Sequence, residues 1–189
     1  YVRNVTNKIG KKDFFIFGEV WHSSDEYVGK YTGRKYNPEK YLFNSITYFP
    51  MKDTIIDVFK KQYPTNNITN RRKNLNYYDV TSQDKLVTFI DNHDMARFLG
   101  AGTLEKYYSH LKLAYVFMMT YPCVPVIYYG TEQGFDGGSD PWNREDMWDG
   151  QWDYGPSKGD NFNKSHQLYK FMKEINDKLD ENKFIRTGS

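Results

Sequence analysis

A short apolar run that ends abruptly in polar residues constrains this chain more than any other feature. Residues 85–98 read KLVTFIDNHDMARF, in which Leu86 to Ile90 are mostly apolar and partly β-branched. That pattern is typical of a strand buried on both faces. The next four residues, Asp91 to Asp94, are all polar, and α/β enzymes place working residues at the carboxyl ends of parallel strands. A strand followed by a polar loop with a capping aspartate is the alternative at this point.

Further segments repeat this apolar pattern, so four strands are expected, near residues 13–20, 42–49, 86–91 and 125–129. Helices are expected between and after them, over about 51–61, 103–120 and 165–179, with a weaker helix within 63–76. Strands that alternate with helices indicate parallel βα units. At least three strands end in polar residues, which is typical of the active face of a (β/α)8 barrel of about 250 residues. The sequence therefore predicts an α/β fold that forms half of such a TIM barrel, over residues 1–189, with no complete second domain.

Length and charge exclude several classes of protein. The 189 residues suffice for one sizeable core. A formal net charge of +2 gives no argument for a nucleic-acid or membrane-surface partner, and no apolar run approaches the ~20 residues of a transmembrane helix. Cys123 is the single cysteine, so no internal disulfide can form. The chain opens on Tyr1 rather than on methionine and is expected to be a piece of a longer protein, which leaves its localisation open.

A second strand segment also ends in a carboxylate. Phe14 to Phe17 form an apolar run, and Glu19 follows it beside Trp21. Burying an ionised carboxylate there would be costly. The pKa of Glu19 is therefore expected to be raised, as a general acid requires at neutral pH. The alternative is that Glu19 lies in a partly solvated loop after the strand.

Charged residues elsewhere are interpreted as solvated. His22, Asp25 and Glu26 lie in a segment expected to be a long loop, and one histidine with two acidic residues on a flexible loop seldom forms a metal site. The short basic cluster at 71–73 is likewise expected in a solvated loop.

Three motifs, taken together and in order, resemble the α-amylase superfamily, glycoside hydrolase family 13. Residues 17–21, FGEVW, resemble the end of strand five of its catalytic barrel, and residues 89–94, FIDNHD, resemble the end of strand seven. Residues 125–134, PVIYYGTEQG, resemble strand eight and its loop. Residues 138–145, GSDPWNRE, are similar to the following loop in bacterial amylases, neopullulanases and cyclodextrin-active members. The resemblance covers essentially the whole chain and implies the C-terminal half of the barrel.

The resemblance implies a retaining α-glucan hydrolase with assigned roles. Glu19 corresponds to the general acid/base, and Asp94 to the carboxylate that stabilises the transition state. Retention also needs a carboxylate nucleophile ~5–5.5 Å from the acid/base. The substrate is expected to be an α-glucan oligosaccharide or polysaccharide. The resemblance and the residue types assign its binding to His93, Asn92, Trp21 and Arg144.

The resemblance also shows what these residues lack. In the family, the nucleophilic aspartate ends strand four and a segment of strand three helps to bind calcium; this sequence contains neither segment. The chain alone is therefore expected to be inactive and to need the N-terminal half of the barrel as its partner. No metal or other cofactor is expected within these residues, although calcium is possible in the full-length parent.

A non-catalytic relative that binds sugar or protein through a degenerate barrel is the alternative. Glu19, His93 and Asp94 are all intact, which favours the enzyme, because a chain freed from catalysis need not keep all three. The sequence leaves open whether α-1,4 or α-1,6 bonds are cleaved, and whether the sugar is transferred to water or to another sugar.

Overall fold

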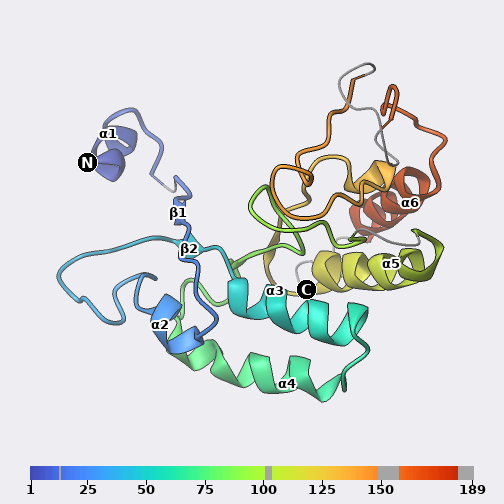
Figure 1. The fold of residues 1–189 in the computed structure, drawn as a ribbon. Helices are drawn as coiled ribbons and strands as arrows, with labels where there is room; N and C mark the ends of the chain where they lie inside the picture. The colour runs from blue at the N-terminus through green and yellow to red at the C-terminus, as the bar shows by residue number, and fades with distance from the viewer. Residues whose placement is uncertain (13, 101–103, 149–157, 183–189) are drawn as a thin grey trace.

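In the computed structural model, the described residues are 1–12, 14–100, 104–148 and 158–182. Among these residues, four short strands alternate with helices; Figure 1 shows the course of the chain. The strands are β1 (Phe17–Gly18), β2 (Ser45–Ile46), β3 (Val87–Thr88) and β4 (Val124–Pro125). The α-helices are α1 (Val2–Lys8), α2 (Asp25–Gly29), α3 (Phe49–Ile55), α4 (Asn66–Lys73), α5 (Leu104–Thr120) and α6 (Gln167–Glu181). Three helical turns of other types are η1 (Ile56–Lys60), η2 (Asn74–Tyr77) and η3 (Thr131–Gln133).

The four strands are parallel neighbours in chain order. Phe17 of β1 pairs with Ser45 of β2, and Val87 of β3 pairs with Val124 of β4. A parallel bridge between Thr47 and Val87 joins the two pairs. Each strand lies in or beside its predicted segment, but each has only two residues in regular ladder. The parallel βα arrangement is therefore seen in short form.

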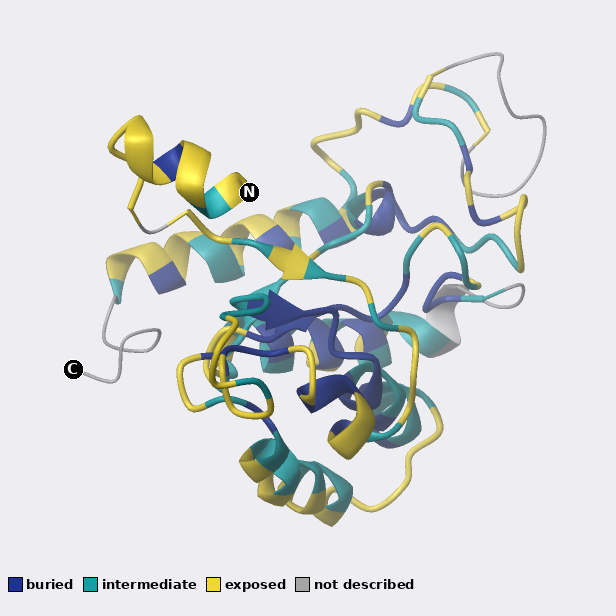
Figure 2. Ribbon diagram, turned by 90° about the vertical axis from the view of Figure 1, so that its left-hand side faces the viewer, coloured by how far each residue is buried: buried dark blue, intermediate teal, exposed yellow. Residues whose placement is uncertain are grey.

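The core lies between the strands and the inner faces of α3 and α5. Pro50 is in the first turn of α3, where a missing N–H costs nothing, and Met51 and Ile55 one turn later are fully buried. Leu111 and Met118 of α5 are also fully buried, as their helical spacing predicts. Figure 2 shows the buried residues gathered at the centre of the fold. None of the described helices combines the length and apolarity needed to cross a membrane.

The helices agree with the sequence in part. The helix expected over 51–61 is α3, continued by η1 as a π-helical turn, and the weak helix expected within 63–76 is α4. The start of the 103–120 helix cannot be compared, because Thr103 lies outside the described residues. Two helices, α1 and α2, were not expected. The start of α2 has a local signal, since the Ser24 side chain accepts a hydrogen bond from the Tyr27 amide at 3.4 Å.

The segment around β1 contradicts its predicted burial. The side chains of Phe14, Phe15 and Phe17 are exposed, at 48%, 37% and 50%. Within the described part of the chain, β1 pairs with β2 alone. The first residues, with α1, lie at the edge of the fold away from the core (Figures 1 and 2). These phenyl rings therefore face solvent on the side where a further strand or helix would cover them.

The loop that follows β1 is anchored by a buried ion pair. Asp25, at the start of α2, is buried and forms an ion pair with Arg71 of α4. Its carboxylate also accepts hydrogen bonds from the Asn74 amide and the Tyr78 hydroxyl, each at 2.8 Å. The expectation that Asp25 and Arg71 are solvated is wrong, because each neutralises the other and the carboxylate oxygens find further donors.

Candidate active site

The end of β1 places Glu19 and Trp21 at the surface. A Cβ on Gly18 would lie 2.7 Å from the Phe43 ring, so the close packing of β1 on this ring requires glycine. Glu19 follows directly and is exposed. Its predicted burial is wrong in this structure, because β1 is the edge of the sheet, and Glu19 lies in the solvated position that was the alternative. The Trp21 ring stacks on Phe49 at 5.2 Å between ring centres and stays 59% exposed.

The end of β3 brings three of the expected site residues together. The Asp94 amide donates a hydrogen bond to Asn92 Oδ1 at 2.9 Å, which fixes a tight turn. His93 Nε2 lies 3.2 Å from Asp94 Oδ2. The His93 side chain is more than half exposed and Asp94 about one third exposed. Such a pair adds little to stability, but its polar atoms can be reached by a solute.

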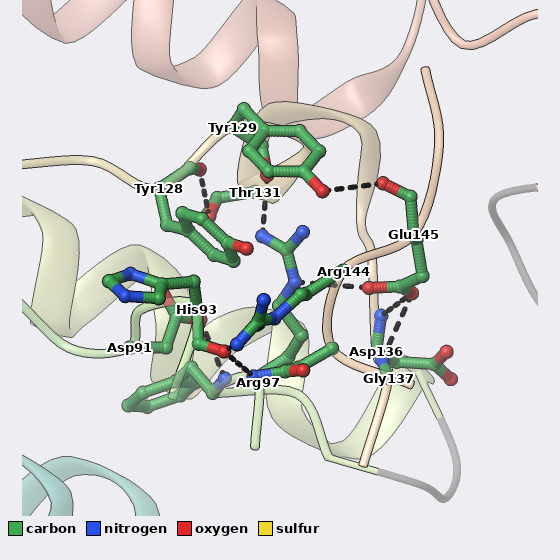
Figure 3. A network of polar contacts seen from close by, with 12 residues as sticks. Asp91, His93, Arg97, Tyr128, Tyr129, Thr131, Asp136, Gly137, Arg144 and Glu145 are labelled. Carbon is green, nitrogen blue, oxygen red and sulfur yellow. Dashed lines mark hydrogen bonds and ion pairs between the residues drawn. The ribbon is translucent and has the colours of Figure 1, made fainter. Parts of the chain in front are cut away.

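Arg144 joins this cluster from the loop after β4. Its Nη2 lies 3.5 Å from Asp94 Oδ1, and its Nε donates to the His93 carbonyl at 3.1 Å (Figure 3). The same Nε lies 2.7 Å from Asp140 Oδ1. Asn92, His93, Asp94 and Arg144 therefore form one cluster, here called the β3-end cluster. Among the described residues, no hydrogen bond or ion pair joins Glu19 or Trp21 to it.

Beneath the β3-end cluster, a buried ion pair holds the loops after β3 and β4 together. Arg97 Nε lies 3.0 Å from Glu145 Oε2, and both side chains are 2% exposed or less. Glu145 Oε1 accepts hydrogen bonds from the amides of Asp136 and Gly137, each at 3.0 Å. Figure 3 shows the Arg97 guanidinium between Glu145 and the Tyr128 ring, whose centre is 3.9 Å away. Sequence reasoning missed this pair, although both residues stand in quoted segments, because nothing in either segment shows that two residues 48 apart in the sequence meet.

Burial raises the pKa of three carboxylates in this region, those of Glu145, Asp91 and Asp136. Burial raises the pKa of Glu145, and the Arg97 charge opposes that rise. Burial also raises the pKa of Asp91, against the opposing hydrogen bond that the Phe98 amide donates to its Oδ2 at 2.8 Å. Asp91 Oδ1 is buried without a hydrogen-bond partner among the described residues. Asp91 therefore fixes the end of β3 by accepting from the Phe98 amide. Its ionised form stabilises the fold less than its protonated form does.

Replacement of Asp91 by asparagine is expected to change the pH dependence of stability. Because the folded pKa of Asp91 is raised, its contribution is fully present below the unfolded value of about 3.9. That contribution is lost as the pH rises through the folded pKa. The thermal midpoint of Asp91→Asn, relative to wild type, should therefore rise as the pH is raised from about 4 through the folded pKa of Asp91. Thermal unfolding of the full-length parent across this range measures the difference.

Asp84→Asn is the matched control, because the Asp84 side chain is 66% exposed and its ionisation should matter little to folding. An equal pH trend in both variants would contradict the assignment to Asp91.

The described residues do not fit a metal site. No three histidine, cysteine, aspartate or glutamate side chains among them are grouped so as to hold an ion. Calcium needs six to eight oxygen ligands, which the β3-end cluster does not offer. No step of the chemistry below is therefore assigned to a metal.

Comparison with known proteins identifies the family. A family model described as the alpha amylase catalytic domain matches residues 1–186. The chain belongs to this α-amylase family. The resemblance seen in the three motifs is thereby confirmed.

Relatives in the α-amylase family are much longer than this chain. It is 35% identical over 180 residues to a beta/alpha-amylase of Paenibacillus polymyxa, which covers 93% of this chain and 13% of that protein. It is 32% identical over 148 residues to a cyclomaltodextrinase of a Bacillus species, covering 77% of this chain and 24% of the relative. The crystal structure of an Anoxybacillus α-amylase superposes with a TM-score of 0.72 at 27% identity, covering 95% of this chain and 36% of that one. The chain thus spans less than two fifths of each of these three proteins.

Proposed function

We propose that this chain supplies the acid/base and one stabilising carboxylate of a retaining glycoside hydrolase that cleaves α-glucosidic bonds in starch-type polysaccharides or maltodextrins. The observation that carries the proposal is the β3-end cluster. In a chain of the α-amylase family, it sets His93 and Arg144 against both oxygens of Asp94, at 3.2 and 3.5 Å. A carboxylate held in place by two neighbouring side chains can still accept hydrogen bonds from a sugar.

The proposed chemistry divides between two strand ends. Glu19 gives a proton to the leaving glycosidic oxygen and then acts as the base toward water or an acceptor sugar. Asp94 supplies negative charge near the oxocarbenium-like transition state. We propose that the nucleophilic aspartate lies outside these residues, on the strand that precedes β1 in a complete barrel. In this proposal, β1 to β4 are strands five to eight.

The remaining assigned residues hold the substrate in this proposal. His93 and Arg144 are each about half exposed, so their ring and guanidinium N–H groups can donate to sugar hydroxyls. Asn92 supports them by shaping the turn through its side-chain oxygen. Trp21 presents an exposed ring, which suits stacking on the apolar face of glucose. Any calcium of the full-length parent would be held by other parts of that protein.

The test compares the full-length parent with residues 1–189 alone, on soluble starch, pullulan and cyclodextrins. The full-length parent is expected to release reducing sugar. Residues 1–189 alone are expected to release none, because an acid without its nucleophile cannot complete the double displacement. Mixing them with the N-terminal half of the barrel tests whether the missing group restores turnover.

Two results would count against the proposal. Turnover by residues 1–189 alone would show that the nucleophile lies within them. A full-length parent that binds these glucans without cleaving them would favour the non-catalytic sugar-binding alternative instead.

A further inference from the structure

Asn143 belongs to the loop after β4, and its side chain is buried against the turn that follows β3, residues 92–95. Its side chain is fully buried. Its Nδ2 donates hydrogen bonds to the backbone carbonyls of His93 and Met95, each at 2.8 Å, and lies 3.3 Å from the Asn92 carbonyl. Three carbonyls of one turn therefore converge on one side-chain amide.

These contacts allow the Asn143 side chain to fix the backbone conformation of the turn. An amide nitrogen has two N–H donors, so two bonds are short and the third contact is longer. Asn143 Oδ1 has no hydrogen-bond partner among the described residues. The side-chain amide of Asn143 therefore makes its hydrogen bonds by donating to the turn. The backbone from Asn92 to Met95 is thus wrapped around a group that is itself inaccessible to a sugar.

The loop that carries Asn143 is held firmly enough to act as a support. Arg144 Nε donates to the His93 carbonyl at 3.1 Å, next to the Asn143 contacts. The Arg97 amide donates to the Gly137 carbonyl at 3.0 Å. A Cβ on Gly137 would lie 1.9 Å from the Trp142 carbonyl oxygen, so the loop folds back on itself more tightly than other residues allow. Side chains on such supports hold reactive groups in fixed geometry.

We propose that Asn143 is a positioning residue that sets the orientation of His93 and Asp94. It acts through the backbone of the turn, because its side chain is buried and cannot touch a substrate. The inference rests on the proposed function, since it assigns a task within that site. Small displacements of a reacting group are costly in rate, so the effect should appear in kcat more than in KM.

The test uses the full-length parent with Asn143→Ala and the matched control Asn161→Ala. Asn161 is also buried, and its Nδ2 also donates to two carbonyls, of Asp146 at 3.1 Å and Gly159 at 2.8 Å. Both variants should lose some thermal stability. Only Asn143→Ala is expected to lower kcat on maltodextrin, by about 10–100-fold, with KM changed by less than about threefold.

A second background separates positioning from general destabilisation. If Asn143 acts through His93, the loss in kcat caused by Asn143→Ala should be at least about twofold smaller in a His93→Ala protein. An equal loss in both backgrounds would overturn the statement that Asn143 orients His93. A loss no greater than that of Asn161→Ala would overturn the proposal.

Hydrogen exchange gives a readout that does not depend on activity. Amides within 91–98 should lose protection in Asn143→Ala and keep it in Asn161→Ala, because the Asn143 side chain donates to this segment whereas the Asn161 amide donates to the carbonyls of Asp146 and Gly159. If the wild-type parent cleaves no α-glucan, the proposed function fails while this comparison still decides whether Asn143 orders the turn. Unchanged exchange in Asn143→Ala would overturn the positioning role.

Discussion

Replacing Glu19 by glutamine in the full-length parent is expected to lower kcat/KM on maltodextrin by about 10²–10⁴-fold. Glutamine keeps the size of the side chain but cannot give a proton to the glycosidic oxygen. The folded state should hardly change, because Glu19 is exposed at the end of β1 and surface substitutions seldom alter stability by more than about 0.5 kcal/mol. Reducing-sugar release, measured with the thermal midpoint of each variant, tests both statements.

The choice of substrate shows whether the lost group is an acid. An aryl maltoside with a good leaving group, such as dinitrophenol, needs little protonation, so Glu19→Gln should lose much less on its first bond cleavage than on maltodextrin. Glu26→Gln is the control, since Glu26 is also exposed and lies in the first turn of α2, shortly after the loop that carries Glu19. Equal losses on both substrates would remove Glu19 from the role of general acid.

Replacing Arg97 by methionine is expected to destabilise the fold by about 3–5 kcal/mol. The change removes the partner of Glu145, whose carboxylate is 2% exposed. A buried carboxylate without its cationic partner either stays ionised and destabilises the folded state, or takes up a proton. The pKa of Glu145, already raised by burial against the Arg97 charge, should rise further. The loss of stability should therefore be smaller at acid pH, where Glu145 is protonated in both states.

The matched control for Arg97 is Lys178→Met, which breaks an exposed pair with Glu174 at 2.6 Å. Exposed helix pairs of this kind contribute about 0.3–0.5 kcal/mol. The double variant Arg97→Met, Glu145→Gln should recover part of the loss, because it removes the stranded charge as well. Thermal or denaturant unfolding of the full-length parent gives the stability of the wild type and of these three variants. If Arg97→Met costs no more than Lys178→Met, the buried pair does not hold the two loops together.

The sequence predicted the placement of the strands better than their surroundings. The segments at 45–49 and 86–91 are buried as their apolar runs indicate, because these strands have neighbours on both sides. The segment at 14–17 has an equally apolar run and is largely exposed. A run of phenylalanines reports what a strand can bury, whereas its actual burial depends on which other elements lie beside it.

The candidate site shows a similar division. Asn92, His93 and Asp94 were found because they share one motif, and Arg144 through the similar loop that follows β4. Asn143 contacts carbonyls 48–51 residues away in the sequence, and the pairing of Asp25 with Arg71 spans 46 residues. Periodicity and spacing within a motif do not report such contacts. The family assignment from motifs was reliable, while the supporting residues needed the three-dimensional structure.

The edge of β1 has a practical consequence for the isolated residues. Within the described chain, β1 pairs with β2 on one side, and Phe17 of β1 is exposed, as are Phe14 and Phe15 just before it. A free strand edge with apolar side chains is a template for intermolecular strand addition and aggregation. Residues 1–189 on their own should therefore self-associate as their concentration rises. If residues 1–189 alone show no turnover, the result can be attributed to the missing nucleophile only when the sample has been shown to be monomeric.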